Sequence, residues 1–170
     1  MMLFRPLDRS DFPLLQKWLA GPHVNRWWHE TLDLAGVEAK FGPRVDGTEP
    51  THVFMIEDNG QPVGWIQWYW WSDYPAHAAQ LGAEPGSAGI DLAIGEEAMI
   101  GRGLGPAAIV QFLRQIVFAN SVYCDPEEAN VRSLRAFEKA GFTAMHSVQL
   151  AGENFRRRVV RFTRSESCQA

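Results

Sequence analysis

The sequence is poor in cysteine. It contains two, Cys124 and Cys168, and they form neither a CxxC motif nor any other spacing typical of metal ligands. The five histidines are likewise scattered without such a spacing. We therefore infer no disulfide framework and expect no resident metal ion.

Long apolar runs and an excess of positive charge are also lacking. The first residues, "MMLFRPLDRSDF", are interrupted by charge after Phe4, so they predict neither a signal peptide nor a membrane span, and we expect a cytoplasmic protein. The formal net charge of −4 argues against general affinity for nucleic acid or an anionic membrane. It is compatible with a small cationic substrate without requiring one.

Tryptophan is absent after Trp71, although the chain has seven. The two parts of the chain therefore differ in composition. A length of 170 residues with 46% hydrophobic content is sufficient for a core, and we expect one domain over 1–170.

Periodicity and turn signals predict a mixed α/β fold, in which a largely antiparallel central sheet is flanked by helices. The expected helices cover residues 10–21, 31–43, 104–118 and 126–141. The expected strands cover residues 2–7, 51–58, 61–71, 88–95, 121–125, 143–150 and 154–164. Asn59-Gly60 predicts a tight hairpin turn. Residues 72–87 are expected to be a long loop with at most one helical turn, and "FRRRVVRF" a basic edge strand.

Three glycines, Gly101, Gly103 and Gly105, precede an apolar run that predicts a helix. Their spacing does not fit the dinucleotide fingerprint, and Pro106 with Ala107 excludes a Walker loop. A glycine-rich turn at a helix N-terminus exposes main-chain N–H groups that a pyrophosphate could approach closely. Arg102 would add a cation, although such a turn alone is more often only a turn.

A second segment, "DPEEANVRSLRAFEKAGF", follows one strand later. The glycine loop, Asn130, the helix after it and the ending "EKAGF" together resemble the GCN5-related N-acetyltransferase family. The resemblance extends over nearly the whole chain and implies acetyl-CoA as cofactor. It implies pyrophosphate contacts from the loop and pantetheine contacts from Asn130 and its helix. The implied cofactor-binding residues are Leu92, Ala93, Ile94, Ile100, Gly101, Arg102, Gly103, Leu104, Gly105, Asn130, Ser133 and Phe137.

Within that family, "VNRWW", "GWIQWY", "AGIDLAIGEEAMIGRGLG" and "CDPEEANVRSLRAFEKAGF" are similar to aminoglycoside 6′-N-acetyltransferases. This resemblance implies acetylation of the 6′-amino group of an antibiotic, hence resistance. Siderophore-type lysine or hydroxyornithine N-acyltransferases share several segments and are the alternative. The sequence departs from the family at Ile100, where Gln or Arg is common, and at Phe137, where many relatives have a tyrosine that protonates the thiolate. Phe137 leaves open water, the product ammonium, Tyr123 or Tyr69 as the source of the proton, and also a degenerate domain that only senses coenzyme A.

Acetylation of an amine requires a group that receives the ammonium. The resemblance implies this role for Asp91, beside backbone amides at Leu92 or Ala93 that face the thioester carbonyl, and a second catalytic role for Asp125. Because a carboxylate raises the pKa of a neighbouring ammonium, Asp91 would capture and orient the amine more than act as a strong base.

Aromatic and acidic residues supply the expected acceptor pocket. Flat rings beside carboxylates suit a sugar that carries ammonium groups. Trp18, in contrast, is expected in the core. The implied substrate-binding residues are Trp28, Gln67, Tyr69, Asp73, Asp91, Asp125 and Glu153, with Glu84 as a further rim carboxylate. The expected partner is a small polycationic amine, and the chain is expected to act as a monomer or homodimer.

Overall fold

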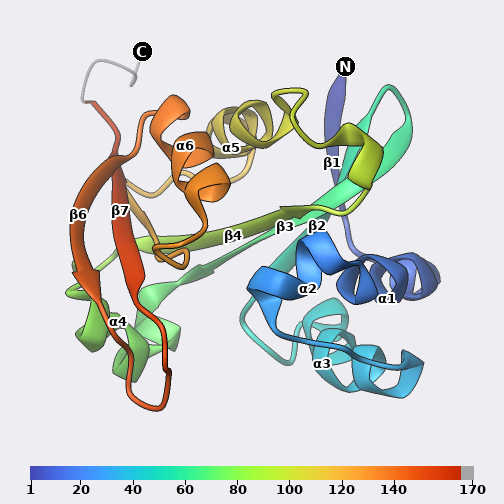
Figure 1. The fold of residues 1–170 in the computed structure, drawn as a ribbon, viewed down its shortest axis with the longest axis horizontal. Coiled ribbons are helices and arrows are strands. Elements are labelled where there is room, and N and C mark those ends of the chain that lie inside the picture. The colour runs from blue at the N-terminus through green and yellow to red at the C-terminus, as the bar shows by residue number, and fades with distance from the viewer. Residues whose placement is uncertain (166–170) are drawn as a thin grey trace. The chain divides into compact units, whose positions relative to one another are not determined.

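A computed structural model describes residues 1–165 of the chain (Figure 1). Cys168 lies outside these residues. Seven strands have the order β1-β2-β3-β4-β5-β7-β6. β4 and β5 pair in parallel, whereas β1–β2, β2–β3, β5–β7 and β6–β7 are antiparallel. The structure therefore confirms the mixed α/β class with a largely antiparallel sheet.

The described residues form two compact units. We call residues 1–68 and 91–104 the N-terminal unit, and residues 69–90 together with those from 105 onward the C-terminal unit. The chain passes from one unit to the other after Trp68, after Ile90 and after Leu104.

The N-terminal unit contains three helices, which gather together in Figure 1, and the first strands. Its elements are β1 (Met2–Pro6), α1 (Phe12–Ala20), α2 (Pro22–Trp28), α3 (Leu34–Asp46), β2 (His52–Asp58), β3 (Gln61–Trp70) up to Trp68 and β4 (Ala88–Ile94) from Asp91, with short 3₁₀ turns at Arg9–Asp11 and Glu97–Met99.

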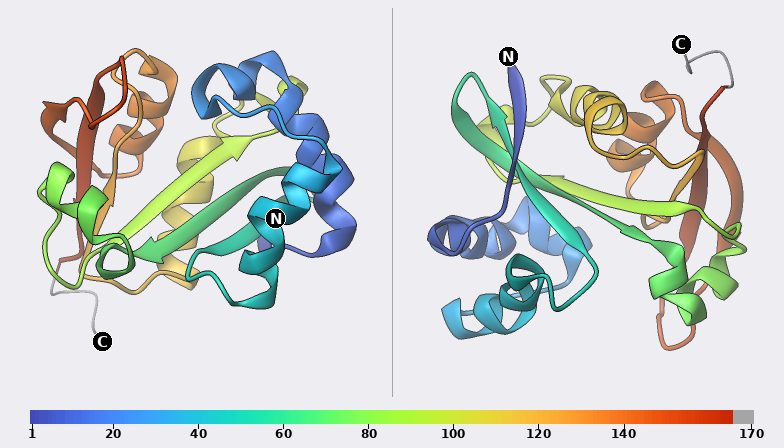
Figure 2. Two further views of the ribbon diagram at one scale, coloured as in Figure 1. Left: turned by 90° about the horizontal axis from the view of Figure 1, so that it is seen from below. Right: turned by 180° about the vertical axis from the view of Figure 1, so that it is seen from behind.

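The C-terminal unit contains the remaining helices and a hairpin whose strands β6 and β7 run side by side (Figure 2). Its elements are a 3₁₀ turn at Trp71–Asp73, α4 (Pro75–Leu81), α5 (Leu104–Gln115) from Gly105, β5 (Ser121–Cys124), α6 (Val131–Lys139), β6 (Thr143–Val148) and β7 (Arg157–Thr163).

Apolar side chains at helical spacing bury one face of α1 in the N-terminal unit. Leu15, Trp18 and Leu19 are fully or almost fully buried, as that spacing predicts. The Trp18 ring stacks on Trp65 of β3, with centroids 6.1 Å apart and planes 11° apart. Gly95 must be glycine, because a Cβ there would lie 2.1 Å from the Trp18 ring.

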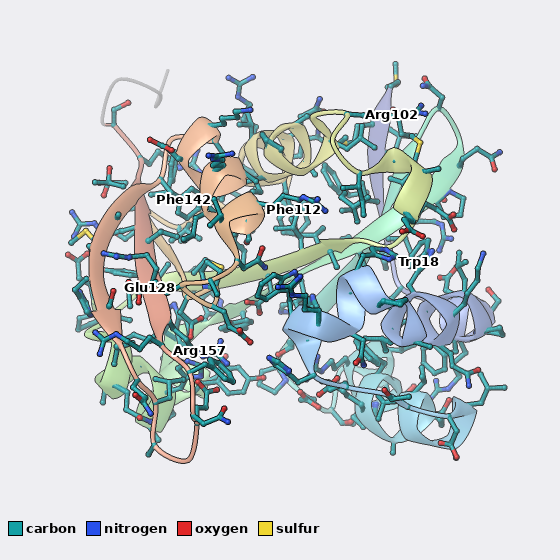
Figure 3. The ribbon with its side chains drawn as sticks, in the orientation of Figure 1. Trp18, Arg102, Phe112, Glu128, Phe142 and Arg157 are labelled. Carbon is teal, nitrogen blue, oxygen red and sulfur yellow. The ribbon has the colours of Figure 1, made fainter. Side chains whose placement is uncertain are left out.

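The core of the C-terminal unit contains no tryptophan from α5, α6 or the last strands, because the sequence has none there. Buried phenylalanines take their place, among them Phe112 and Phe142, which Figure 3 labels. Phe137 of α6 packs edge to face on Phe142 at 5.0 Å between centroids. The contact between these two rings attaches α6 to the segment that leads into β6.

Two expectations for the N-terminal unit need correction. α2 was not expected, although Pro22 stands at the start of the helix, where its missing N–H has no cost. α3 extends past Pro43 to Asp46 and ends at Gly47, whose φ of 75° stops the helix.

Two expectations for the C-terminal unit are wrong. Residues 75–81 form a seven-residue helix, α4, where a long loop with at most one helical turn was expected. Pro75 stands at its start and Gly82, at a φ of 70°, at its end. β7 is not an edge strand, because it pairs with β5 on one side and β6 on the other. Its arginines pair with carboxylates instead of protecting an edge: Arg157 with Glu153, Arg158 with Glu128, and Arg161 with Glu84.

Candidate functional site

The glycine bend before α5 exposes its main chain. Gly101 and Gly103 have φ values of 79° and 78°, in the left-handed region where a side chain is unfavourable. A Cβ built on either would meet nothing within 4 Å, and Arg102 between them is exposed. Figure 3 labels Arg102 at this bend. The two glycines are therefore needed for the left-handed backbone conformation of the bend, and the bend remains accessible to a ligand.

Gly105 has a different role from the other two glycines. It lies in the first turn of α5, and a Cβ there would meet the Cβ of Ala136 in α6 at 3.7 Å. That is an ordinary contact, so this position tolerates a small side chain. The N–H groups of the first helical turn have no acceptor within the helix, which makes them possible donors to an anion.

Asn130 and Ser133 define the start of α6. The Oδ1 atom of Asn130 accepts a hydrogen bond from the backbone N–H of Ser133 at 3.2 Å, as an N-cap residue does. Phe137, one turn further along, is 1% exposed and packs in the core. The implied contact of Phe137 with pantetheine stays a prediction.

Asp91 belongs to a hydrogen-bonded chain in the N-terminal unit. Nε2 of Gln67 donates to Oδ2 of Asp91 at 3.1 Å. Oε1 of Gln67 accepts a hydrogen bond from Nη1 of Arg44, also at 3.1 Å. Nε of Arg44 in turn donates to Glu49 at 2.8 Å. Gln67 is thus held between a guanidinium and a carboxylate.

The other candidates of the N-terminal unit lie on α2, on β4 and in the segment after β4. Trp28 is half-buried and contacts Trp65 at 5.0 Å between ring centroids. Gly64 allows β4 to approach β3, because a Cβ there would lie 2.1 Å from the carbonyl oxygen of Ala93. Asp91, Leu92, Ala93, Ile94, Ile100 and Leu104 are all half-buried. The structure thus places them at a boundary between core and surface.

Asp125 is a buried charge in the C-terminal unit, 3% exposed and directly after β5. Nε2 of His77 lies 2.9 Å from its Oδ2 atom, and Nη1 of Arg157 lies 3.5 Å from the same atom. The same Nη1 donates to the backbone carbonyl of Asp125 at 3.1 Å. Arg157 extends from β7, where Figure 3 labels it. A cation and an imidazole therefore compensate this buried carboxylate.

The two tyrosines considered as acids are both buried in the C-terminal unit. The ring of Tyr69 occupies the space left by Gly89, where a Cβ would come within 2.3 Å of it. It packs edge to face on Trp71 and Tyr74. Tyr123 contacts Arg161, and a hydrogen bond with the Tyr123 hydroxyl raises the pKa of the Arg161 guanidinium. Both rings thus have defined partners.

The expected acidic rim consists largely of paired carboxylates. Glu153 makes two contacts with Arg157, at 2.7 and 2.5 Å. Glu84 binds Arg161 at 2.8 Å and the Ser121 hydroxyl at 3.0 Å. Asp73 is exposed in the turn after β3. Neither pairing was expected, and each reduces the negative charge that the rim presents.

Sequence reasoning missed three side chains in these networks. Arg44 was not considered, His77 was counted only among histidines without metal-ligand spacing, and Arg157 was counted only as part of a basic strand. No local pattern marks them, because Arg44 lies 23 residues from Gln67, and His77 lies 48 residues from Asp125.

The strand order and the glycine bend before α5 define a mixed α/β fold with an accessible turn at a helix N-terminus. A family model described as "Acetyltransferase (GNAT) domain" matches residues 8–150. The chain belongs to this family.

Individual relatives share a smaller part of their sequence with this chain, as the following identities show. The aminoglycoside N(6′)-acetyltransferase type 1 of Klebsiella pneumoniae is 28% identical over 159 residues, covering 85% of this chain and 75% of that protein. The lysine N-acyltransferase MbtK of Mycobacterium tuberculosis is 25% identical over 143 residues, covering 81% and 66%. A crystal structure of aminoglycoside acetyltransferase AAC(6′)-Ib with coenzyme A and kanamycin has a TM-score of 0.78 and 26% identity, covering 96% and 95%.

No helix among residues 1–165 is both long enough and apolar enough to cross a bilayer.

Proposed function

We propose that the protein transfers the acetyl group of acetyl-CoA to a primary amine of an aminoglycoside, its 6′-amino group, and thereby confers resistance. The observation that supports binding of the cofactor is the exposed bend of Gly101 and Gly103. A Cβ atom built on either glycine would meet no other atom within 4 Å. The similarity to aminoglycoside N(6′)-acetyltransferases supports the acceptor half. The proposal locates the reaction in the cytoplasm.

The residues of the bend fit an anionic cofactor. Their main-chain N–H groups, with Arg102 beside them, would hold the pyrophosphate, as helix N-termini bind phosphates. Asn130, Ser133 and Phe137 remain the proposed contacts for pantetheine. When bound, acetyl-CoA supplies an activated acyl group as a thioester.

The chain's own residues would position the acceptor. The carboxylate of Asp91, oriented by Gln67, binds the ammonium and passes its proton to water. Main-chain N–H groups near Leu92 and Ala93 would polarise the carbonyl that the amine attacks. Holding both reactants in place can contribute about 7–11 kcal/mol to lowering the barrier. Asp125, which already binds His77 and Arg157, would shape the pocket more than exchange protons.

The direct test measures release of free coenzyme A with kanamycin or tobramycin as acceptor, together with mass spectrometry of the product. Acetylated antibiotic is the expected result. Lysine and spermidine serve as the other acceptors. Turnover of lysine alone would replace the proposed acceptor, and binding of coenzyme A without any turnover would indicate a sensor domain.

A small-amine acceptor of the lysine or hydroxyornithine type is the second candidate. It is favoured by the ion pairs of Glu84 and Glu153 with Arg161 and Arg157, which leave the rim less acidic than a polycation would prefer. The 25% identity to a lysine N-acyltransferase points the same way. The lysine arm of the assay decides between the two.

The bend can be tested by itself with a matched pair of glycine variants. Gly103→Ala and Gly60→Ala place a Cβ at the same φ of 78°, and neither Cβ meets an atom within 4 Å. Both should therefore lose similar stability from backbone strain. Calorimetry should show weaker coenzyme A binding for Gly103→Ala, while Gly60→Ala in the β2–β3 turn binds as the wild type does. Equal affinities would contradict the proposed phosphate site.

A further inference from the structure

Arg44 lies near the end of α3 and is linked to the candidate catalytic carboxylate of Asp91 through Gln67. Its side chain is 13% exposed, and its Nη1 atom donates to Oε1 of Gln67 at 3.1 Å. Gln67 is 7% exposed and donates to Asp91 at 3.1 Å. The three residues come from α3, β3 and β4 of the N-terminal unit. A cation is thus connected to the carboxylate by one neutral amide.

The two contacts of Gln67 permit one orientation of its amide. A guanidinium only donates hydrogen bonds and an ionised carboxylate only accepts them. If the amide were reversed, its oxygen would face Asp91 and its NH₂ group would face Arg44, so both contacts would become repulsive. With Arg44 in place, Gln67 has both its oxygen and its NH₂ group engaged.

Arg44 also strengthens the contact that it does not itself make. Hydrogen bonds in a chain polarise one another, and the effect is larger away from water. The guanidinium draws electron density toward Oε1 of Gln67, which makes the NH₂ group a better donor to Asp91. Without Arg44, Gln67 would keep a buried oxygen with no guanidinium partner, and its side chain would have reason to turn toward another donor.

We propose that Arg44 is a positioning residue for the acceptor end of the reaction: through Gln67 it fixes the orientation of the Asp91 carboxylate that receives the amine. The inference rests on the proposed function, because it assigns Asp91 to the acceptor. A small displacement of an orienting group is costly, since catalysis depends on a near-attack geometry.

A purely structural role for Arg44 is the competing explanation. Arg44 also pairs with Glu49 at 2.8 Å, and its guanidinium lies 5.3 Å from the ring centroid of Phe41. Either contact could stabilise α3 without any effect on Asp91. The experiment therefore has to separate the contact with Gln67 from the contacts with Glu49 and Phe41.

A double-mutant cycle makes this separation. Arg44→Met keeps an unbranched chain over Phe41 and removes the guanidinium, and Gln67→Leu removes the amide. Arg44→Met should lower kcat about 10-fold, with the affinity for acetyl-CoA unchanged. In the Gln67→Leu background it should lower kcat by no more than about 2-fold, because the path to Asp91 is already broken.

Two further variants serve as controls. Glu49→Gln disrupts the pair with Arg44 and leaves the contact with Gln67, so its kcat should match the wild type. Arg44→Lys keeps a cation that can donate to Oε1 of Gln67 but loses the planar fork that also reaches Glu49, so it should recover part of the lost turnover. If Arg44→Met is unfolded at the assay temperature, Arg44→Gln replaces it in the cycle. An equal loss of kcat from the Arg44 variant in both backgrounds would overturn the proposal.

A spectroscopic readout keeps this inference separate from the proposed function. The side-chain amide signal of Gln67, assigned in ¹⁵N-glutamine-labelled protein by its loss in Gln67→Leu, should shift in Arg44→Met and stay in place in Glu49→Gln. If the wild type acetylates no amine, the proposed function fails and this signal alone decides the link from Arg44 to Gln67. An unmoved signal in Arg44→Met would overturn the link even in an active enzyme.

Discussion

Asp91 and Asp125 are the two candidate catalytic carboxylates, and they differ in burial and in the contacts that orient them. Asp91, in β4 of the N-terminal unit, is half-buried and accepts a hydrogen bond from the neutral amide of Gln67. Asp125, after β5 of the C-terminal unit, is 3% exposed and contacts Arg157 and His77 directly. One carboxylate is oriented by a neutral amide, and the other is compensated by a cation.

The difference indicates different tasks for the same residue type. A buried carboxylate is costly unless a cation and hydrogen bonds replace the water that it has lost. Arg157 and His77 meet that need for Asp125, so its charge is already matched inside the protein. Gln67 orients Asp91 through a neutral amide, which fits the proposed role of Asp91 in receiving an ammonium.

The largest effect should come from removing the cation beside Asp125. Arg157→Met leaves a buried carboxylate and Glu153 without their guanidinium. We expect the free energy of unfolding to fall by about 3 kcal/mol, as when one partner of a buried pair is lost. Chemical denaturation followed by circular dichroism measures it.

The neighbouring arginine provides the matched control for that variant. Arg158 pairs with Glu128 at 2.6 Å, and both side chains are about one third exposed, at 36% and 34%. Arg158→Met should therefore cost less than about 1 kcal/mol, the usual range for surface pairs. Equal losses of stability for the two variants would show that the contact between Arg157 and Asp125 contributes no more than a surface ion pair. The proposed difference between Asp91 and Asp125 would then lose its support.

The next largest effect concerns Asp91. Asp91→Asn keeps the size of the side chain and removes the charge that is proposed to attract the amine. We expect kcat to fall about 100-fold, with the affinity for acetyl-CoA nearly unchanged. Steady-state kinetics and calorimetry with coenzyme A provide the two measurements.

Asp125→Asn sharpens the same comparison. Its charge is matched by Arg157, so we expect a decrease in kcat well below that of Asp91→Asn, about 10-fold or less. A larger loss from Asp125→Asn would reverse the assignment and make Asp125 the residue that receives the amine. Loss of coenzyme A affinity in Asp91→Asn would indicate that Asp91 contributes to binding the cofactor, and would contradict its proposed role at the acceptor.

The sequence was sufficient wherever the determining interactions are local. The spacing of Leu15, Trp18 and Leu19 predicts the buried face of α1, and Asn59-Gly60 predicts the turn between β2 and β3. Local signals for α4 were also present, since Pro75 begins the helix and Gly82 ends it. They were missed because turn-forming residues are frequent throughout residues 72–87.

Contacts between distant residues could not be predicted in the same way. The central position of β7 depends on its pairing with β5 and β6, and "FRRRVVRF" fits an exposed edge equally well until that pairing is known. The partners of Asp125 come from α4 and β7, and those of Gln67 from α3 and β4. Residue types and short spacings do not encode contacts between residues so far apart in the sequence. The sequence therefore singled out Asp91 as a candidate but not the residues that hold it.

A smaller effect should follow from removing His77. His77→Leu deletes the hydrogen bond to Asp125 and leaves Arg157 as its cation. We expect a loss of about 1.5 kcal/mol in the free energy of unfolding, the lower end for hydrogen bonds to charged groups. His77→Gln, which can still donate to the carboxylate, should recover most of it in the same denaturation experiment. Equal losses in both variants would mean that ring packing against Trp71, not the hydrogen bond, sets the contribution of His77.

The smallest effect separates orientation from charge in the network of Asp125. Glu153 lies four residues before Arg157 and holds it at 2.5 and 2.7 Å, with both side chains 23% exposed. Glu153→Gln keeps one acceptor for the guanidinium and leaves Arg157 beside Asp125, so the loss of stability should be about 0.5 kcal/mol. If Glu153 instead belongs to a rim that binds a polycation, the same variant would raise KM for kanamycin while leaving KM for lysine unchanged. A rise in KM for kanamycin alone would show that Glu153 contributes to the acceptor pocket. An unchanged KM for both amines would show that Glu153 acts only as a partner of Arg157.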